Sequence, residues 1–136
     1  CSTVSMDENL LYKIRFQNVG NYAARRAFIK DGLSDHLDWE TFEFVSSSHP
    51  FDYYLKNGTL CFLNENIDLP DSTSNPEGSQ GYIIFKIGIK EDTKPFQKID
   101  NMAEIQFDYN EFIATNMASI ITVPEGYYEK LSAFAY

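Results

Sequence analysis

The chain is poor in the residues from which most catalytic and metal centres are built. Its 136 residues include two histidines, two cysteines, and 11 basic side chains against 20 acidic ones. The net charge of −9 disfavours nucleic acid and anionic membranes as partners, because both would repel the chain. No apolar run approaches the ~20 residues of a membrane-spanning helix. No signal peptide is visible, so we expect a mature chain or a part of a longer one.

The cysteine count excludes a zinc centre but leaves several roles open for Cys1 and Cys61. A structural zinc site needs about four close ligands. Cys1 has three interpretations. It marks an arbitrary start of the chain, it is the lipid-bearing first residue of a processed lipoprotein, or it forms a disulfide with Cys61 of the same or a neighbouring chain.

What the chain does have is apolar and aromatic content, at 43% and 15%, enough for one folded domain. Between residues 10 and 17, apolar and polar side chains alternate, which is the pattern of a half-buried strand. This segment reads as the edge of a β-sandwich, with Tyr12, Ile14 and Phe16 in the core. Asn57-Gly58 lies between two β-rich runs and predicts a hairpin, because a type I′ turn needs positive φ at both central residues.

The remaining segments predict an all-β antiparallel sandwich of about seven to eight strands. The Cys…Trp…Cys pattern of antibody domains is absent. We expect a flexible lead-in at 1–9, the sandwich at 10–123 and an aromatic tail at 124–136. Residues 33–39 are expected to hold a short helical turn, 30–32 a turn, and 64–80 a loop that crosses between the sheets. Further strands are predicted at 23–29, 42–45, 82–89 (central in its sheet), 102–107 and 116–123, with Phe85 or Ile84, Ile105 and Phe107 inward.

Several separated motifs occur in an order that resembles a known family. They are L-Y-x-I-x-F-Q-N-x-G at 11–20, I-x-D-x-L at 29–33, Leu37-Asp38, Ser48-His49, L-P-D-S-T-S-N at 69–75, S-x-G at 79–81 with F-K-I at 85–87, and I-Q-F-D-Y-N at 105–110 with I-x-T-N at 113–116. The chain is similar to the immunoglobulin-like "conserved repeat" module of secreted Bacteroidota proteins, which often precedes a type IX secretion sorting domain. The resemblance implies an immunoglobulin-like sandwich, an extracellular or cell-surface location and no enzymatic activity. The lead-in and the tail depart from that family's pattern.

Catalysis is not expected from His36 or His49. Ser48 precedes His49, but we expect neighbours on one loop not to aim at each other as a triad does, and no G-x-S-x-G elbow exists. We therefore assign no catalytic residue and no cofactor apart from calcium. Asp71, Asp108 and Asn110 supply oxygen atoms that suit calcium, although their spacing fits no EF-hand and such residues often form Asx-turns.

Three further features concern partners. Trp39, Tyr53, Tyr54 and Tyr109 offer rings on which sugars stack. Ser72 lies in Asp71-Ser72-Thr73, which resembles the O-glycosylation site of these bacteria. The tail carries apolar side chains that suit assembly with another chain, namely Tyr127, Leu131, Phe134 and Tyr136.

Together these features predict a non-catalytic extracellular structural or adhesion module, either a spacer or a surface-assembly domain. One alternative is a self-assembling, pilus-like fibre subunit joined by strand donation. Another is a carbohydrate-binding module. The expected partners are other protein domains, copies of the same chain, or carbohydrate.

Overall fold

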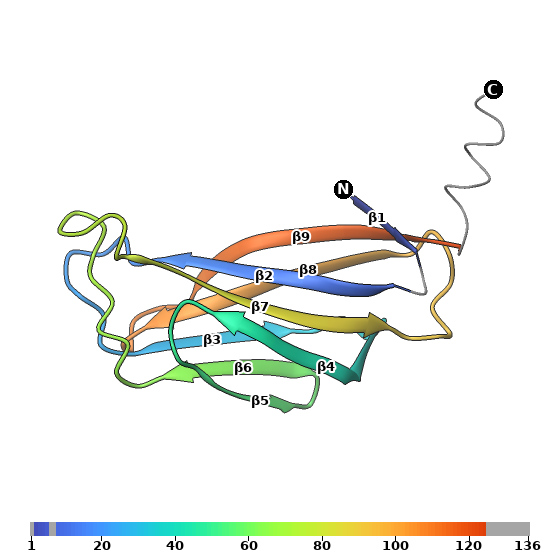
Figure 1. Cartoon of the computed structure of the whole chain (residues 1–136), viewed down its shortest axis with the longest axis horizontal. Helices are drawn as coiled ribbons and strands as arrows, with labels where there is room; N and C mark the ends of the chain where they lie inside the picture. Colours follow the sequence, from blue (N-terminus) through green and yellow to red (C-terminus); the bar gives the residue numbers. More distant parts are fainter. Residues whose placement is uncertain (1, 6–7, 125–136) are drawn as a thin grey trace, which may run out of the picture.

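The computed structural model describes residues 2–5 and 8–124, which form nine strands and no helix (Figure 1). No helix in these ranges is long and apolar enough to cross a membrane. The strands are β1 (Ser2–Ser5), β2 (Asn9–Gln17), β3 (Ala27–Gly32), β4 (Leu37–Ser47), β5 (Asp52–Lys56), β6 (Thr59–Asn64), β7 (Gln80–Ile89), β8 (Lys98–Phe107) and β9 (Ile113–Val123).

Two sheets pack face to face as a sandwich, which confirms the predicted fold class (Figure 1). One sheet has six strands in the order β1-β9-β8-β3-β6-β5, and the other has three in the order β2-β7-β4. β2 lies at an edge and β7 at the centre of the smaller sheet, as the sequence predicts. The segment between β6 and β7 crosses from one sheet to the other, also as predicted.

The Asn57-Gly58 hairpin joins β5 and β6 as expected. Asn57 has a φ of 50° and Gly58 a φ of 78°, so both central residues adopt the left-handed conformation that the turn requires. A Cβ on Gly58 would also lie 2.8 Å from the ring of Trp39. Glycine is therefore required here by backbone conformation and by close packing.

The core lies between the sheets and contains the residues that alternation predicts. Phe85 is fully buried. The centroid of its ring lies 5.4 Å from that of Tyr12, 5.6 Å from that of Phe42 and 6.3 Å from that of Phe62. Ile84 points to the outer face and is half-buried. The other predicted core residues are all buried, namely Ile14, Phe16, Ile105 and Phe107.

Three local predictions are wrong. Residues 33–39 form no helical turn; a hydrogen-bonded turn leads into β4, which begins at Leu37. β3 continues through the predicted turn at 30–32, because this segment pairs with β6 and β8, and Asp31 also points inward and bonds to a side chain of β8. β3 begins at Ala27 rather than residue 23, since Ala24 instead forms an isolated bridge with Leu69.

The lead-in also contains structure that the sequence analysis does not anticipate. β1 pairs in parallel with the last part of β9, so that Ser2 lies beside Ile120 and Ser5 beside Val123. The chain therefore enters β1 close to the point where it leaves β9, at one end of the sandwich (Figure 1).

Candidate functional site

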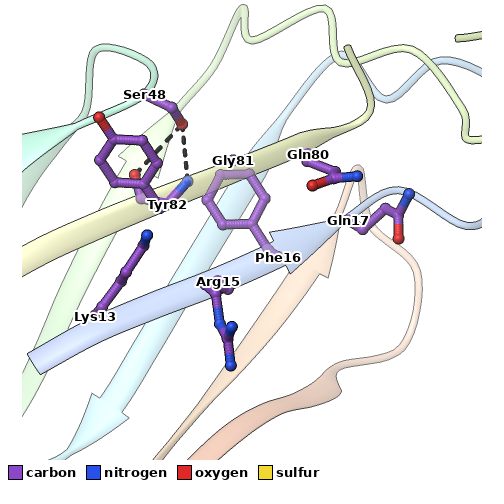
Figure 2. A pocket seen from close by; sticks show the side chains of 8 residues that line it. All are labelled: Lys13, Arg15, Phe16, Gln17, Ser48, Gln80, Gly81 and Tyr82. Carbon is purple, nitrogen blue, oxygen red and sulfur yellow. Dashed lines mark hydrogen bonds between the residues drawn. The ribbon is translucent and has the colours of Figure 1, made fainter. Parts of the chain in front are cut away.

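The outer face of the three-stranded sheet carries an open groove of about 450 Å³ (Figure 2). Strands β2 and β7 form its base, and the bend directly after β4 contributes one residue, Ser48. The lining residues are Lys13, Arg15, Phe16, Gln17, Ser48, Gln80, Gly81 and Tyr82.

Strand register determines which side chains meet in this groove. Arg15 pairs with Tyr82, and Gln17 pairs with Gln80. Because alternate residues of a strand point to the same face, Lys13, Arg15 and Gln17 of β2 all project outward. The Lys13 ammonium lies 5.0 Å from the centre of the Tyr82 ring, within cation–π range (Figure 2). The groove thus presents two cations, two amides and an aromatic ring in a chain of net charge −9.

Gly81 has a packing role at the edge of this groove. It is buried, and a Cβ at this position would lie 2.3 Å from the Phe16 ring and 2.8 Å from Ser48 Oγ. The missing side chain lets the Phe16 ring extend beneath β7. A larger residue would displace Phe16, whose ring also contacts His49, Phe51 and Phe107.

The side chains of Ser48 and His49 contact each other, although neighbours on one loop are not expected to aim at each other as a triad does. Ser48 Oγ lies 2.7 Å from His49 Nδ1. The same hydroxyl accepts a hydrogen bond from the Tyr82 amide at 2.8 Å and donates one to the Tyr82 carbonyl at 3.4 Å (Figure 2). Ser48 therefore continues the hydrogen bonding between β4 and β7. Among the described residues, no carboxylate bonds to His49, so the pair has no orienting third group. Partial burial lowers the pKa of His49 from its ordinary 6.5.

His36 lies in the turn before β4, apart from Ser48 and His49 in the sequence and in the fold. Its amide donates to Ser34 Oγ at 3.1 Å, and its carbonyl accepts the Lys90 amide at 2.9 Å. These bonds give His36 a backbone role at the start of the β7–β8 connection.

The predicted calcium ligands form hydrogen bonds that involve the backbone of two loops. Asp108 Oδ1 accepts the amides of Arg25 at 2.9 Å and Arg26 at 3.1 Å. Asp71 Oδ2 accepts the Ser74 amide, and bonding within this turn, above all to Ser74, lowers the pKa of Asp71. Asn110 bonds through its own backbone, donating to the Phe107 carbonyl. Within residues 2–5 and 8–124, no three His, Cys, Asp or Glu side chains gather as metal ligands would.

The four aromatic residues proposed for sugar stacking lie at separate places. Tyr53 stacks on Phe44, with centroids 5.1 Å apart and the rings nearly parallel. Trp39 packs against the hairpin turn and donates from Nε1 to the Ser34 carbonyl. Tyr54 pairs across strands with Cys61, and Tyr109 lies under the Arg26 guanidinium at 4.6 Å. They do not form one platform.

Of the other candidate positions, the structure describes Ser72 and Cys61. Ser72 is half-buried in the turn after Asp71, and its amide donates to the Asn18 carbonyl at 2.8 Å. Cys61 is a buried free cysteine on β6. Cys1 lies outside the described residues, and its neighbour Ser2 is on β1, four strand positions from β6. The tail candidates, Tyr127, Leu131, Phe134 and Tyr136, lie outside the described residues.

Sequence reasoning missed one polar cluster altogether. Tyr12, Asp31 and Asn101 are buried between the sheets, although their surroundings are apolar. The sequence does contain a signal for it: Asp31 continues the alternation of Ala27 and Ile29, which places it on the inward face of β3. The Lys-Asp-Gly segment resembles a turn, so this alternation is easily overlooked.

Comparison with known proteins gives a family and a fold. A family model described as "Domain of unknown function (DUF7619)" matches residues 1–121, including the lead-in. No curated protein matches the chain. Among solved structures, the C-terminal domain of the AgI/II polypeptide BspA from Streptococcus agalactiae has a TM-score of 0.63 at 11% identity, covering 90% of this chain and 45% of that one.

Two further structures share the fold. The major pilin subunit BcpA of Bacillus cereus has a TM-score of 0.56 at 13% identity, over 90% of this chain and 36% of that one. AvmM, described as catalysing macrocyclization in alchivemycin A biosynthesis, has a TM-score of 0.51 at 14% identity, over 93% and 85%. The chain spans less than half of the BspA and BcpA chains. At these identities the likeness shows the immunoglobulin-like sandwich alone.

Proposed function

We propose that this chain, which belongs to the DUF7619 family, is a non-catalytic extracellular module that is attached at one end and contacts partners with its outer surface. Its role is structural or adhesive, at the cell surface or in secreted proteins. The resemblance to the Bacteroidota "conserved repeat" module supports this location.

The position of β1 carries the proposal. An in-line spacer would be expected to receive the chain at one end of the sandwich and release it at the other. Here Ser2 lies beside Ile120, only three residues before the end of β9 at Val123, or about 10 Å at the rise of a strand. β9 itself is 11 residues long and begins at Ile113, about 33 Å from its other end. Entry and exit at one end suit a module that projects from its attachment.

The absence of assembled catalytic machinery supports a non-catalytic role. In the described part of the chain, Ser48 is used by the backbone of β7, and His49 has no carboxylate partner. The fold likeness to AvmM brings no reaction with it, because one sandwich fold serves binding proteins and enzymes alike.

The groove on β2 and β7 favours carbohydrate as the partner class. Gln17 and Gln80 supply hydrogen-bond donors and acceptors, and Tyr82 supplies a ring for sugar packing. Lys13 and Arg15 add positive charge, so the preferred ligand is a saccharide that carries carboxylate or sulfate groups. Such a ligand is complementary to the groove, while the net negative charge of the chain disfavours non-specific anion binding.

Assembly into a fibre is a second candidate, because both sheets have edges. The three-stranded sheet ends in β2 and β4, and the six-stranded sheet ends in β1 and β5. An added strand from another chain would satisfy the backbone groups of such an edge. β4 is a poor acceptor, since its pairing with β7 is interrupted by two irregularities.

The test is binding by the full chain immobilised on beads through either its first or its last residue. The beads are offered a panel of neutral, carboxylated and sulfated polysaccharides, together with extracellular-matrix proteins. We expect retention of the anionic polysaccharides, and the same retention for both attachments, because the two ends of the described fold lie together. Binding to none of the panel, or binding through one attachment only, would contradict the proposal.

A further inference from the structure

Three polar side chains meet inside the otherwise apolar core. Tyr12 comes from β2, Asp31 from β3 and Asn101 from β8, and their exposed fractions are 6%, 0% and 5%. The residues beside Asp31 in the sheet are Leu60 on β6 and Ala103 on β8, and both are buried. A polar group in such a place is costly unless its hydrogen bonds are made.

The hydrogen bonds of this cluster are half complete. Asn101 Nδ2 donates to Asp31 Oδ2 at 2.8 Å. The second oxygen of each group, Asp31 Oδ1 and Asn101 Oδ1, has no partner among the described residues, and neither does the Tyr12 hydroxyl. If Asp31 were ionised, both oxygens would be acceptors without a donor, and a negative charge would lie in the core. Native proteins seldom leave buried polar atoms in that state.

We propose that Asp31 and Asn101 form a buried proton-binding site, in which Asp31 is the neutral acid and its proton lies on Oδ1 and is donated to Asn101 Oδ1. A carboxylic acid offers one donor and one acceptor side by side, and a primary amide offers the same pair. The two groups then form a ring closed by two hydrogen bonds, one of which is the bond already observed. One proton thereby satisfies two of the three unpartnered oxygens of the cluster, Asp31 Oδ1 and Asn101 Oδ1.

The electrostatic surroundings of Asp31 favour the neutral form. Burial raises the pKa of Asp31 from 3.8 to about 6, although the bond from Asn101 opposes this rise. From β2 the group that faces it is Tyr12, whose own pKa is raised to about 12 by burial, by Asp31 and by Asp100 of β8. Tyr12 is therefore a neutral hydroxyl. In residues 2–5 and 8–124, Asp31 has no salt bridge to a lysine, arginine or histidine.

The site joins two central strands of the six-stranded sheet. β3 and β8 are neighbours in that sheet, and Asp31 and Asn101 link them through side chains as well as backbone. Loss of the proton places a charge at this junction and breaks one of the two bonds. The sandwich is therefore most tightly held when the surroundings are weakly acidic, whatever partner its outer surface binds.

The direct test is a carbon-13 NMR titration of the Asp31 carboxyl in the full chain, from pH 8 to pH 5. We expect Asp31 to take up its proton with a midpoint near 6, so that it is mainly neutral at pH 5. The same titration of Asp31→Asn, which lacks this carboxyl, identifies the Asp31 signal. An Asp31 that is still ionised at pH 5 would overturn the proposal.

An isosteric variant provides a second test. Asp31→Asn supplies a permanent donor where the proton would lie, so it keeps both bonds of the ring at any pH. We expect its melting temperature at pH 8 to equal or exceed that of the wild type, with Asp52→Asn as the matched control. A variant that melts well below the wild type at pH 8, or that does not fold, would contradict the neutral pair.

Discussion

The stability of this sandwich should fall as pH rises from 4 to 8, and Asp31 determines the size of the effect. Its pKa of about 6, against 3.8 for an ordinary aspartate, corresponds to about 3 kcal/mol of unfolding free energy, because each pKa unit is worth about 1.4 kcal/mol. Such a value is a large part of the ~5–15 kcal/mol by which domains are typically stable.

The sign follows from proton binding. Between pH 3.8 and 6 the folded state holds the Asp31 proton and the unfolded state does not, so rising pH favours unfolding. The contribution is complete below about pH 4 and is lost above about pH 6. Asp71, whose pKa is lowered, acts in the opposite sense. It stabilises the folded state above its unfolded pKa of 3.8, and this stabilisation is lost as the pH falls below that value. The pKa of His49 is also lowered, so His49 makes stability rise with pH near its ordinary pKa of 6.5.

The assay is urea unfolding at pH 4, 5, 6, 7 and 8 for the wild type and for Asp31→Asn. Subtracting one profile from the other removes the contributions of His49 and Asp71, which both proteins share. We expect the wild type to lose about 2 kcal/mol relative to the variant across pH 4–6, and about 0.4 kcal/mol more between pH 6 and 8. A flat difference, or a wild type that gains stability with pH relative to the variant, would refute the reasoning.

Three other substitutions test the packing and the loops. Gly58→Ala should cost about 1–3 kcal/mol in urea unfolding, because of the positive φ and the contact with Trp39; Gly32→Ala, where nothing lies within 4 Å of a new Cβ, is the control. Phe85→Ala should cost about 3–5 kcal/mol, since the ring is fully buried among other rings. Asp108→Ala should lower the melting temperature equally with calcium and with a chelator, because the carboxylate accepts two backbone amides. A loss confined to the calcium-containing sample would instead identify Asp108 as a calcium ligand.

The elements that could be predicted from the sequence are those in which local pattern and tertiary environment agree. The alternation in β2 specifies both its conformation and its buried face, and Asn57-Gly58 specifies its hairpin almost alone. β7 is recognisable because its apolar residues form a nearly continuous run, as in a central strand.

The predictions fail in segments whose structure depends on residues far away in the sequence. Asp31 lies 70 residues from Asn101, and the Lys-Asp-Gly segment is held in a strand by backbone pairing with β6 and β8 as well as by this side-chain bond. The Ser48 hydroxyl contacts His49 and also bonds to the backbone of Tyr82, 34 residues away, which local sequence does not reveal. β1 is only four residues long and depends on β9 for its hydrogen bonds.

The central claim, that the chain is a binding module acting through the groove on β2 and β7, is tested most directly by two double variants. One removes both groove cations, Lys13→Ala with Arg15→Ala, and the other removes two exposed cations of the opposite sheet, Lys30→Ala with Lys98→Ala. Both change the net charge equally, so the comparison separates a site from general electrostatics. With sulfated or carboxylated polysaccharide on a biosensor, the account predicts at least tenfold weaker binding for the groove variant and nearly unchanged binding for the control. Equal binding by both variants would contradict it.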